Sequence, residues 1–373
     1  MKPLYPVRRP ARLRVLCILA LAAALLLLLA DIPVLAEYFF ARGVTRLLSW
    51  FLSGISGILP FSLYEVTALC LIACAVLLVI GFIVLLHDRN FARVRLWLYR
   101  LAAAGLSVLI AFGALYAPLY ERLPAAGALG LPEVTVTDEL AYAAAEYYVE
   151  ELNALSDRME RDGAGNVVCP YTFGEIAGLL NAAFAEYEGG YFAPYSVRPK
   201  AVALSVGMSA IGITGIYFPF YAEANLNTNI PSYELGVTMA HELAHAHGVA
   251  QEGEANVVAY VLCLRSGDDY LRYGGLMRAV ASLLNSLPEE PFEELYARLR
   301  PQIVQEWRNA DELYSRYDGW LDTLSAFLND LFLKANGVPG GTRSYSQTAE
   351  SLIALYVHCL LYTSDAADEA RSV

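Results

Sequence analysis

Histidine and charged residues are scarce in this chain. It has 5 histidines among 373 residues, and 17% of its residues are charged whereas 57% are hydrophobic. So little charge excludes an ordinary soluble protein and favours a membrane part joined to a globular part. The first 117 residues carry 11 Lys and Arg against 4 Asp and Glu, and the remainder carries 15 against 34. Because the globular part lacks a basic face, we expect no nucleic-acid partner.

The six cysteines lack CxxC spacing, which excludes an evident disulfide framework. Cys17, Cys70 and Cys74 lie in apolar segments, and the other three are spread widely. Buried thiols are the favoured interpretation. A disulfide between Cys169 and Cys263 stays open for a domain outside the cytoplasm.

Long apolar runs predict a membrane region over residues 1–119. Three spans are expected, at about 13–36, 66–86 and 98–119. A cleaved signal peptide is the alternative for the first run, but no small-x-small cleavage site follows it cleanly. Residues 38–58 alternate arginines with large apolar residues, which indicates an amphipathic helix at the membrane surface.

Arginines predict the orientation. They precede the first span and return in the loop at 87–95, so both segments are expected in the cytoplasm. Three crossings then place everything after the third span outside. Residues 120–132, rich in Pro, Ala and Gly, are expected as a linker to an extracytoplasmic domain at 133–360. The tail at 361–373 departs from the preceding pattern and is interpreted as non-native sequence.

The globular part is predicted to be α+β, mostly helical with a small sheet. Short β-branched runs at 201–206 and 211–218 indicate strands, and residues 223–229 read as a polar loop. Ser232 is the expected N-cap of a helix from about 233 to 247. A further helix is expected at 138–161. Another should begin after the capping box formed by Thr172 and Glu175. More helices are expected at 269–284, 292–308, 311–334 and 346–360.

The pattern His-Glu-x-x-His, at residues 241 to 245, indicates a zinc site. His241 and His245 are four apart on the expected helix, so both imidazoles project from one face toward a single Zn²⁺ ion. Glu242 is then the candidate general base. Gly248 favours a sharp reversal after the helix, which would return a downstream residue to the metal.

Two glutamates compete for the place of the third ligand. Glu252 is preferred because Asn256 lies four residues later and can brace a neighbouring group. The pattern Glu-x-Glu-Ala-Asn also resembles the ligand helix of other glutamate-ligated zincins. Glu254 is the alternative, and a solvated carboxylate in the first helical turn explains it equally simply.

Other polar residues have weaker patterns. His247 is expected to face away from the metal and to act as a cation near the helix C-terminus. Zincins often use a downstream side chain to stabilise the oxyanion, and Tyr345 is the candidate, with Tyr317 and Arg316 as alternatives. No spacing selects among these three.

Several segments together resemble a bacterial multi-pass membrane family that is known only as a domain of unknown function and is regarded as zincin-like. They are Pro60 to Ser62, Gly215 to Asn225, His241 to Asn256, Leu333 to Gly337 and Ser344–Tyr345, together with the three spans. The resemblance implies this architecture and a metallopeptidase activity in the bacterial cell membrane, and it implies no substrate.

The expected function is therefore a membrane-anchored zinc metallopeptidase that acts on a peptide or protein outside the cytoplasm. The alternative is a membrane sensor or assembly factor in which zinc is structural or catalysis is incidental. Glu242 favours the enzyme, because a structural site needs only ligands. An intramembrane protease is excluded, because no apolar run of spanning length surrounds the motif.

Overall fold

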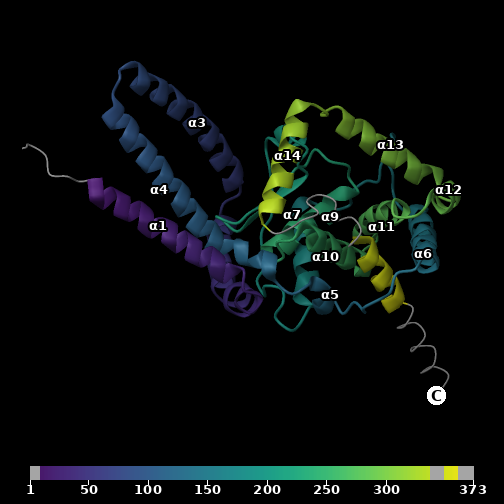
Figure 1. Cartoon of the computed structure of the whole chain (residues 1–373). Coiled ribbons are helices and arrows are strands. Elements are labelled where there is room, and N and C mark those ends of the chain that lie inside the picture. Colours follow the sequence, from purple (N-terminus) through teal and green to yellow (C-terminus); the bar gives the residue numbers. More distant parts are fainter. Residues whose placement is uncertain (1–8, 337–347, 360–373) are drawn as a thin grey trace, which may run out of the picture.

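The computed structural model describes residues 9–336 and 348–359 (Figure 1). Within this part, three helices are long and apolar enough to cross a membrane: α1 (Arg9–Ala30), α3 (Leu63–His87) and α4 (Phe91–Leu115). They extend together away from the remaining helices (Figure 1). The start of α1 and the turn between α3 and α4 lie at the far end. The tail expected at 361–373 lies outside the described residues.

The ends of the membrane helices differ from expectation. The first span ends at Ala30 rather than near residue 36, because Pro33 has no N–H to continue the helical hydrogen bonds. The third ends at Leu115 rather than near 119, where Pro118 lies in the 3₁₀ helix η2 (Ala117–Glu121). The expected amphipathic helix at 38–58 consists of two elements, the π-helix η1 (Leu35–Val44) and α2 (Thr45–Ile58).

Residues 120–132 are packed against the domain and do not hang free as a linker. They include the short helix α5 (Ala125–Ala128). Ala125, Leu129 and Leu131 are buried in the same hydrophobic cluster as the domain helices. The segment between the apolar helices and the site is therefore packed against the domain.

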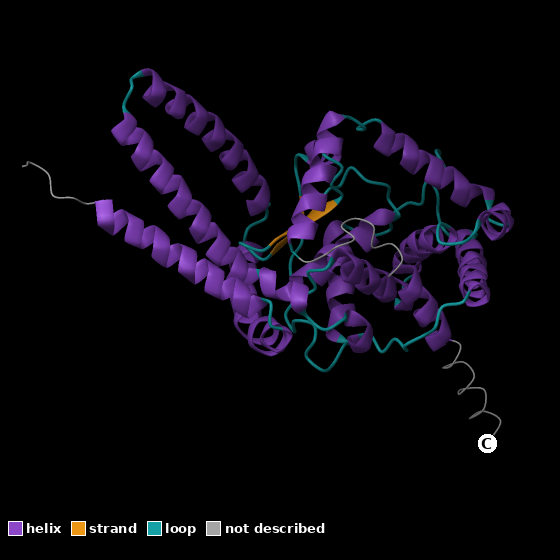
Figure 2. Cartoon of the chain, in the orientation of Figure 1, coloured by secondary structure: helices purple, strands orange, loops and turns teal. Residues whose placement is uncertain are grey.

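The sheet has three short strands in the order β1 (Lys200–Ala201), β3 (Glu223–Leu226), β2 (Gly215–Phe218). β1 pairs with β3 in parallel and β2 pairs with β3 antiparallel, with Ile216 opposite Asn225. Figure 2 shows this sheet at the side of the domain that meets the membrane helices.

Two predictions about this region were wrong. The strand expected at 201–206 stops after Ala201 and is followed by the helix α8 (Ser205–Ser209), whose Ser205 hydroxyl bonds the Val202 carbonyl at 2.6 Å. The loop expected at 223–229 begins with β3, because its polar side chains are buried against hydrogen-bond partners.

Polar contacts join the sheet to the start of α3. The Glu223 carboxylate on β3 accepts the backbone N–H groups of Leu63 at 3.3 Å and Tyr64 at 3.0 Å. In return, the Glu65 carboxylate accepts the N–H groups of Ala203 at 3.1 Å and Leu204 at 2.7 Å. These carboxylates satisfy backbone donors that would otherwise be unpaired at a helix start and a strand end. The membrane helix and the sheet are consequently fixed to each other.

Helices make up the rest of the domain. They are α6 (Asp138–Ser156), α7 (Phe173–Ala185), α9 (Glu234–Ala246), α10 (Glu252–Arg265), α11 (Asp269–Leu284), α12 (Glu289–Ala297), α13 (Pro301–Ser315), α14 (Trp320–Ala335) and a helix at 348–359. The expected capping box of Thr172 and Glu175 is present at the start of α7. The core lies where α9, α10 and α11 pack together and against α6.

Two helices expected between residues 292 and 334 have other boundaries in the structure. The stretch expected as one helix at 311–334 is broken between α13 and α14, where Gly319 is extended. The helix expected at 292–308 is likewise divided, because Pro301 begins α13 and has no N–H for a preceding turn. α14 is thereby free to lie in a different direction from α13 (Figure 1).

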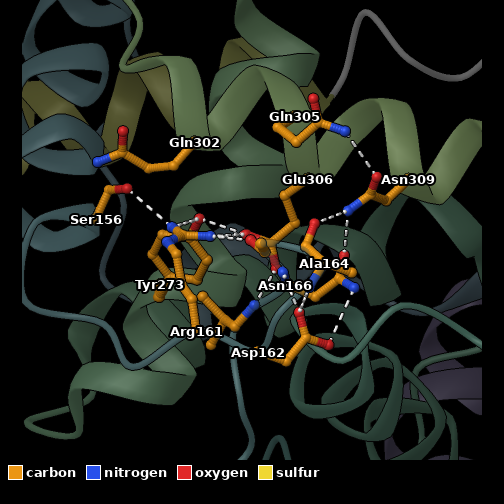
Figure 3. A network of polar contacts seen from close by, with 12 residues as sticks. Ser156, Arg161, Asp162, Ala164, Asn166, Tyr273, Gln302, Gln305, Glu306 and Asn309 are labelled. Atoms are coloured by element: carbon orange, nitrogen blue, oxygen red, sulfur yellow. Dashed lines mark hydrogen bonds and ion pairs between the residues drawn. The ribbon is translucent and has the colours of Figure 1, made fainter.

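A buried carboxylate ties α13 to the rest of the domain (Figure 3). Glu306 accepts hydrogen bonds from Arg161 at 2.9 Å, Tyr273 at 2.7 Å and the backbone N–H of Val167 at 2.8 Å. Arg161 follows α6, which ends at Ser156 rather than near 161, and forms an isolated β-bridge with Val167. The charge of Glu306 is thus paired by groups from two other segments.

All six cysteines are free thiols, so the Cys169–Cys263 disulfide is not formed. Cys263 is buried in α10, Cys169 and Cys359 are partly buried, and Cys17, Cys70 and Cys74 are exposed on α1 and α3. The interpretation of buried thiols is therefore confirmed for Cys263 alone.

Candidate metal centre

Helix α9 presents His241 and His245 on the same side. Their Nε2 atoms are 3.0 Å apart, and their rings meet edge to face with centroids 4.6 Å apart. The helix begins at Glu234 after Tyr233 and has no side-chain cap, so the predicted N-cap was wrong. The Ser232 hydroxyl is buried without a hydrogen-bond partner among the described residues.

The chain reverses sharply after α9, as the glycine predicted. Gly248 has φ +101°, a left-handed conformation that strains any other residue. Its carbonyl accepts a hydrogen bond of 2.7 Å from Arg122, and Arg122 is paired in turn with the buried Glu37 of η1 at 3.0 Å. An element that follows the first apolar helix therefore holds the turn after the histidines.

The reversal brings Glu252, the first residue of α10, to the histidines. Its Oε2 lies 3.1 Å from Nε2 of His241 and 3.6 Å from Nε2 of His245. The ligand atoms of these three residues lie within 4.8 Å of one another. The alternative, Glu254, is directed elsewhere: it accepts the N–H of Ala125 at 2.6 Å. The geometry thus brings the preferred glutamate, and not the alternative, to the pair of histidines.

Hydrogen bonds orient both rings. Nδ1 of His245 lies 2.6 Å from the carbonyl oxygen of Val249, which can only accept, so this nitrogen carries a proton. Nδ1 of His241 lies 2.9 Å from Oδ1 of Asn256 and donates to it. Both Nε2 lone pairs and the Glu252 carboxylate then converge on one point. Such a donor set fits a divalent cation, and two histidines with a glutamate are a ligand set of catalytic zinc sites.

His245 and Glu252 shift each other's pKa. Burial lowers the pKa of His245, but the carboxylate of Glu252 outweighs this effect and raises it to about 9. Burial alone would raise the pKa of Glu252, whereas His245 and His241 hold it well below its ordinary value. At neutral pH the group therefore attracts a positive charge, which a proton or a cation can supply. Binding of a cation would release that proton.

Glu242 lies beside this group and is buried. Burial raises its pKa to about 7, against the lowering effect of His241 and His245. Its Oε2 atom is buried without a hydrogen-bond partner among the described residues. Gly215 on β2 makes room for it, because a Cβ on Gly215 would lie 2.5 Å from Oε1 of Glu242. The carboxylate is thus held between α9 and β2, with a pKa suited to proton transfer near neutral pH.

A cavity of about 830 Å³ opens over these residues. Its lining includes the ligand candidates His241, His245 and Glu252, together with Glu242. Residues of β2, α4 and α14 line it as well. This volume lies within the range of ligand-binding clefts. The cavity is therefore large enough to hold a ligand beside the histidines and Glu242.

The structure adds tyrosines that the sequence reasoning missed. The hydroxyl of Tyr116 lies 3.3 Å from Nδ1 of His245, and the ring of Tyr217 stacks on His245 with centroids 6.4 Å apart. Both line the cavity. Tyr116 follows α4 directly and was assigned to the third span, so its hydrophobic neighbours concealed it. Only the turn after α4 brings it to the site.

Two of the three candidates for stabilising the oxyanion, Tyr317 and Arg316, lie within the described residues. Tyr345 lies outside the described residues. Tyr317 accepts a hydrogen bond of 3.0 Å from Asn229, and neither Tyr317 nor Arg316 is among the residues that line the cavity.

The role expected for His247 was wrong. It faces away from the ligand candidates, as predicted, but it is buried and stacks on Phe184 with centroids 4.1 Å apart. Its Nδ1 donates to the carbonyl of Ala193 at 2.7 Å. Burial lowers the pKa of His247 to about 4, so the ring is neutral and is not a cation.

A family model described as "Protein of unknown function (DUF3810)" matches residues 40–353. The matched stretch runs from η1 into the helix at 348–359 and includes every residue of the site. No curated protein and no solved structure matches the chain.

Proposed function

We propose that this chain, which belongs to the DUF3810 family of proteins of unknown function, is a membrane-anchored zinc metallopeptidase. The observation that carries this proposal is the convergence of His241, His245 and Glu252 beside the buried, unpartnered carboxylate of Glu242. Ligands alone would serve a structural ion. A carboxylate with a pKa of about 7 next to them, opening on a cavity, supports hydrolysis.

The identity of the metal follows from the donor set. Two imidazoles and one carboxylate are the ligands of many catalytic zinc sites, which keep a further position open. The Asn256 and Val249 contacts hold the rings in the tautomer that ligation requires. Hard cations such as Mg²⁺ prefer oxygen ligands, so they fit this set less well.

Each residue then has a role in hydrolysis. A bound zinc ion would polarise the substrate carbonyl and lower the pKa of a water molecule. Glu242 accepts the proton of the attacking water and returns it to the leaving amine. His241, His245 and Glu252 hold the ion, and Asn256 fixes the ring of His241. Tyr116, whose hydroxyl lies 3.3 Å from Nδ1 of His245 and which lines the cavity, is our candidate hydroxyl for an oxyanion.

An extended peptide is the substrate that the cavity favours. β2 is an edge strand, and its residues Gly215, Ile216 and Tyr217 line the cavity. A peptide can add to such an edge through its backbone, which places a carbonyl near Glu242 on the neighbouring helix. This arrangement supports peptide bonds over small polar substrates.

We place the site outside the cytoplasm. The start of α1 and the turn between α3 and α4 lie at the end away from the domain (Figure 1). Arg12, Arg14 and Arg89 are at that end, and positive charge favours the cytoplasmic side. The domain at the other end of the helices then faces outward.

The test uses the full chain purified in lipid nanodiscs. Zinc content and cleavage of a peptide library are measured for the wild type and for Glu242→Gln. We expect one zinc ion per chain in both proteins and a loss of cleavage of about 10²-fold or more in the variant, because the proton acceptor is removed. Bound zinc without cleavage in either protein would instead favour a zinc-binding sensor or assembly factor. Equal cleavage in both would assign the activity to a contaminant.

A further inference from the structure

Helix α14 carries its side chains in an inverted arrangement. Asp322, Ser325 and Asn329 line the cavity over the site. Most of its large apolar side chains lie on the other face of the helix and are exposed, among them Trp320 at 73% and Phe327 at 63%. Phe332 lines the cavity and Leu333 is buried. A helix on the surface of a soluble domain normally does the opposite, with its apolar stripe toward the protein. The outer face of α14 therefore requires an apolar environment outside the domain.

The position of α14 identifies that environment. Its Phe332 ring meets Phe112 of α4 edge to face, with centroids 6.0 Å apart. Phe112 is one helical turn from the end of a helix apolar enough to cross a membrane. Figure 1 shows α14 along the side of the domain that faces the three membrane helices. The end of α14 is consequently at the level where α4 leaves the bilayer.

Further apolar side chains lie on the same side of the domain. Leu204 and Val206 at α8 are exposed, next to the backbone groups that Glu65 in the first turn of α3 binds. On α2, Trp50 and Phe51 are exposed as well. Exposed apolar side chains thus also lie on two elements that contact apolar helices, α8 beside the start of α3 and α2 beside α4.

We infer that α14 lies in the interface of the bilayer that the chain's own helices span, with Trp320, Leu324, Phe327, Leu328 and Leu331 in lipid and its polar face toward the cavity. The helix then forms the wall between the lipid and the site. It carries two acidic residues and one basic residue, so hydrophobic insertion and not attraction to anionic lipid holds it there. A tryptophan in the first turn suits this interface.

This inference rests on the placement of α14 and not on the proposed peptidase activity. It is tested in full-length protein in phosphatidylcholine nanodiscs, with p-benzoylphenylalanine in place of Phe327. Irradiation attaches this group to the C–H bonds that surround it, and the adducts are identified by mass. The matched control places the same group at Ser325, on the cavity side of the same helix. A second control places it at Glu312, which is exposed on α13.

We expect lipid adducts at position 327 in several-fold excess over positions 325 and 312. The same replacement at Trp320 should give the same result, which keeps the test open if the first variant fails to fold. The inference would be overturned if the groups at positions 327 and 320 both formed adducts with residues 337–347 or with another part of the chain. Adducts of both groups with a second copy of the chain would overturn it as well. Equal lipid labelling at 327 and 312 would do so too. Zinc content and cleavage play no part in the readout.

Discussion

The side-chain oxygen of Asn256 lies 2.9 Å from Nδ1 of His241, so a residue of α10 fixes the ring of a residue of α9. This contact joins the two helices on either side of the reversal at Gly248. It is local in sequence, and it determines which nitrogen of His241 faces Glu252.

Asn256→Ala should therefore weaken zinc binding by about 10- to 100-fold, because the imidazole loses the partner that orients it and keeps its proton on Nδ1. Competition with a chromophoric chelator measures the affinity. Asn256→Asp, which retains an acceptor at the same place, is the matched control and should bind nearly as well as the wild type. An unchanged affinity in Asn256→Ala would remove Asn256 from the site.

Gly215→Ala should reduce cleavage without removing zinc. The added methyl group would overlap the Glu242 carboxylate, with the Cβ 2.7 Å from Cγ and 2.8 Å from Cδ of that residue. Because Glu242 is not a ligand, the ion is retained while the carboxylate is displaced. We expect a loss of about 10-fold or more in kcat, since proton transfer depends on position.

Gly178→Ala in α7 is the control, because a Cβ there meets nothing within 4 Å. Zinc content and cleavage of both variants are measured in parallel. Normal cleavage by Gly215→Ala would show that Glu242 does not need its present position.

Acid should remove a stabilising contribution of Glu37. Burial raises the pKa of this carboxyl group, but its ion pairs with Arg122 and Arg42 outweigh burial and lower the pKa from the ordinary value of 4.5. The unfolded chain therefore takes up the proton more readily than the folded one. The contribution is complete above the unfolded pKa and is lost as the pH falls through the lowered folded value.

The measurement is the midpoint of thermal unfolding in detergent as the pH is lowered from about 6, where the carboxyl group is ionised in both states. The wild type should lose stability more steeply than Glu37→Gln, and the two curves should approach each other at low pH. Parallel curves would mean that the folded pKa of Glu37 is ordinary.

Glu306→Ala should destabilise the domain by about 3 to 5 kcal/mol, because it leaves Arg161 without its buried partner. The side chain of Glu306 is 1% exposed and that of Arg161 15%. Arg158→Ala is the control. Its ion pair with Asp269 is more than half exposed on both sides, so its removal should cost about 1 kcal/mol or less. Denaturant unfolding compares the two variants, and equal losses would contradict the role assigned to Glu306.

The geometry around the histidines could be predicted because it is local. Helical periodicity puts His241 and His245 on one face, and a left-handed glycine returns the chain within a few residues. The three membrane helices were predictable for a similar reason, since length and hydropathy are properties of a continuous segment. Even so, the ends at Ala30 and Leu115 depend on Pro33 and Pro118, which interrupt the helical hydrogen bonds and leave little trace in the hydropathy.

The remaining features depend on contacts between distant segments. β3 has no hydrophobic alternation, because Glu223 and Asn225 are buried against polar partners from the start of α3. His247 is neutral because Phe184 and Ala193 enclose it, and neither is near it in sequence. Tyr116 reaches the site from the end of a membrane helix. In each case the decisive neighbour is far away along the chain.

The carboxylates that cross between the sheet and α3 restrict how this protein can change over evolutionary time. Deletion of the first three helices would leave Glu223 with no backbone N–H groups to accept from and Arg122 with no Glu37. A form of the domain without this part of the chain would therefore leave two buried charged groups without these partners, which is destabilising. It would need new partners for both groups at once, so anchor and site are inherited as one unit.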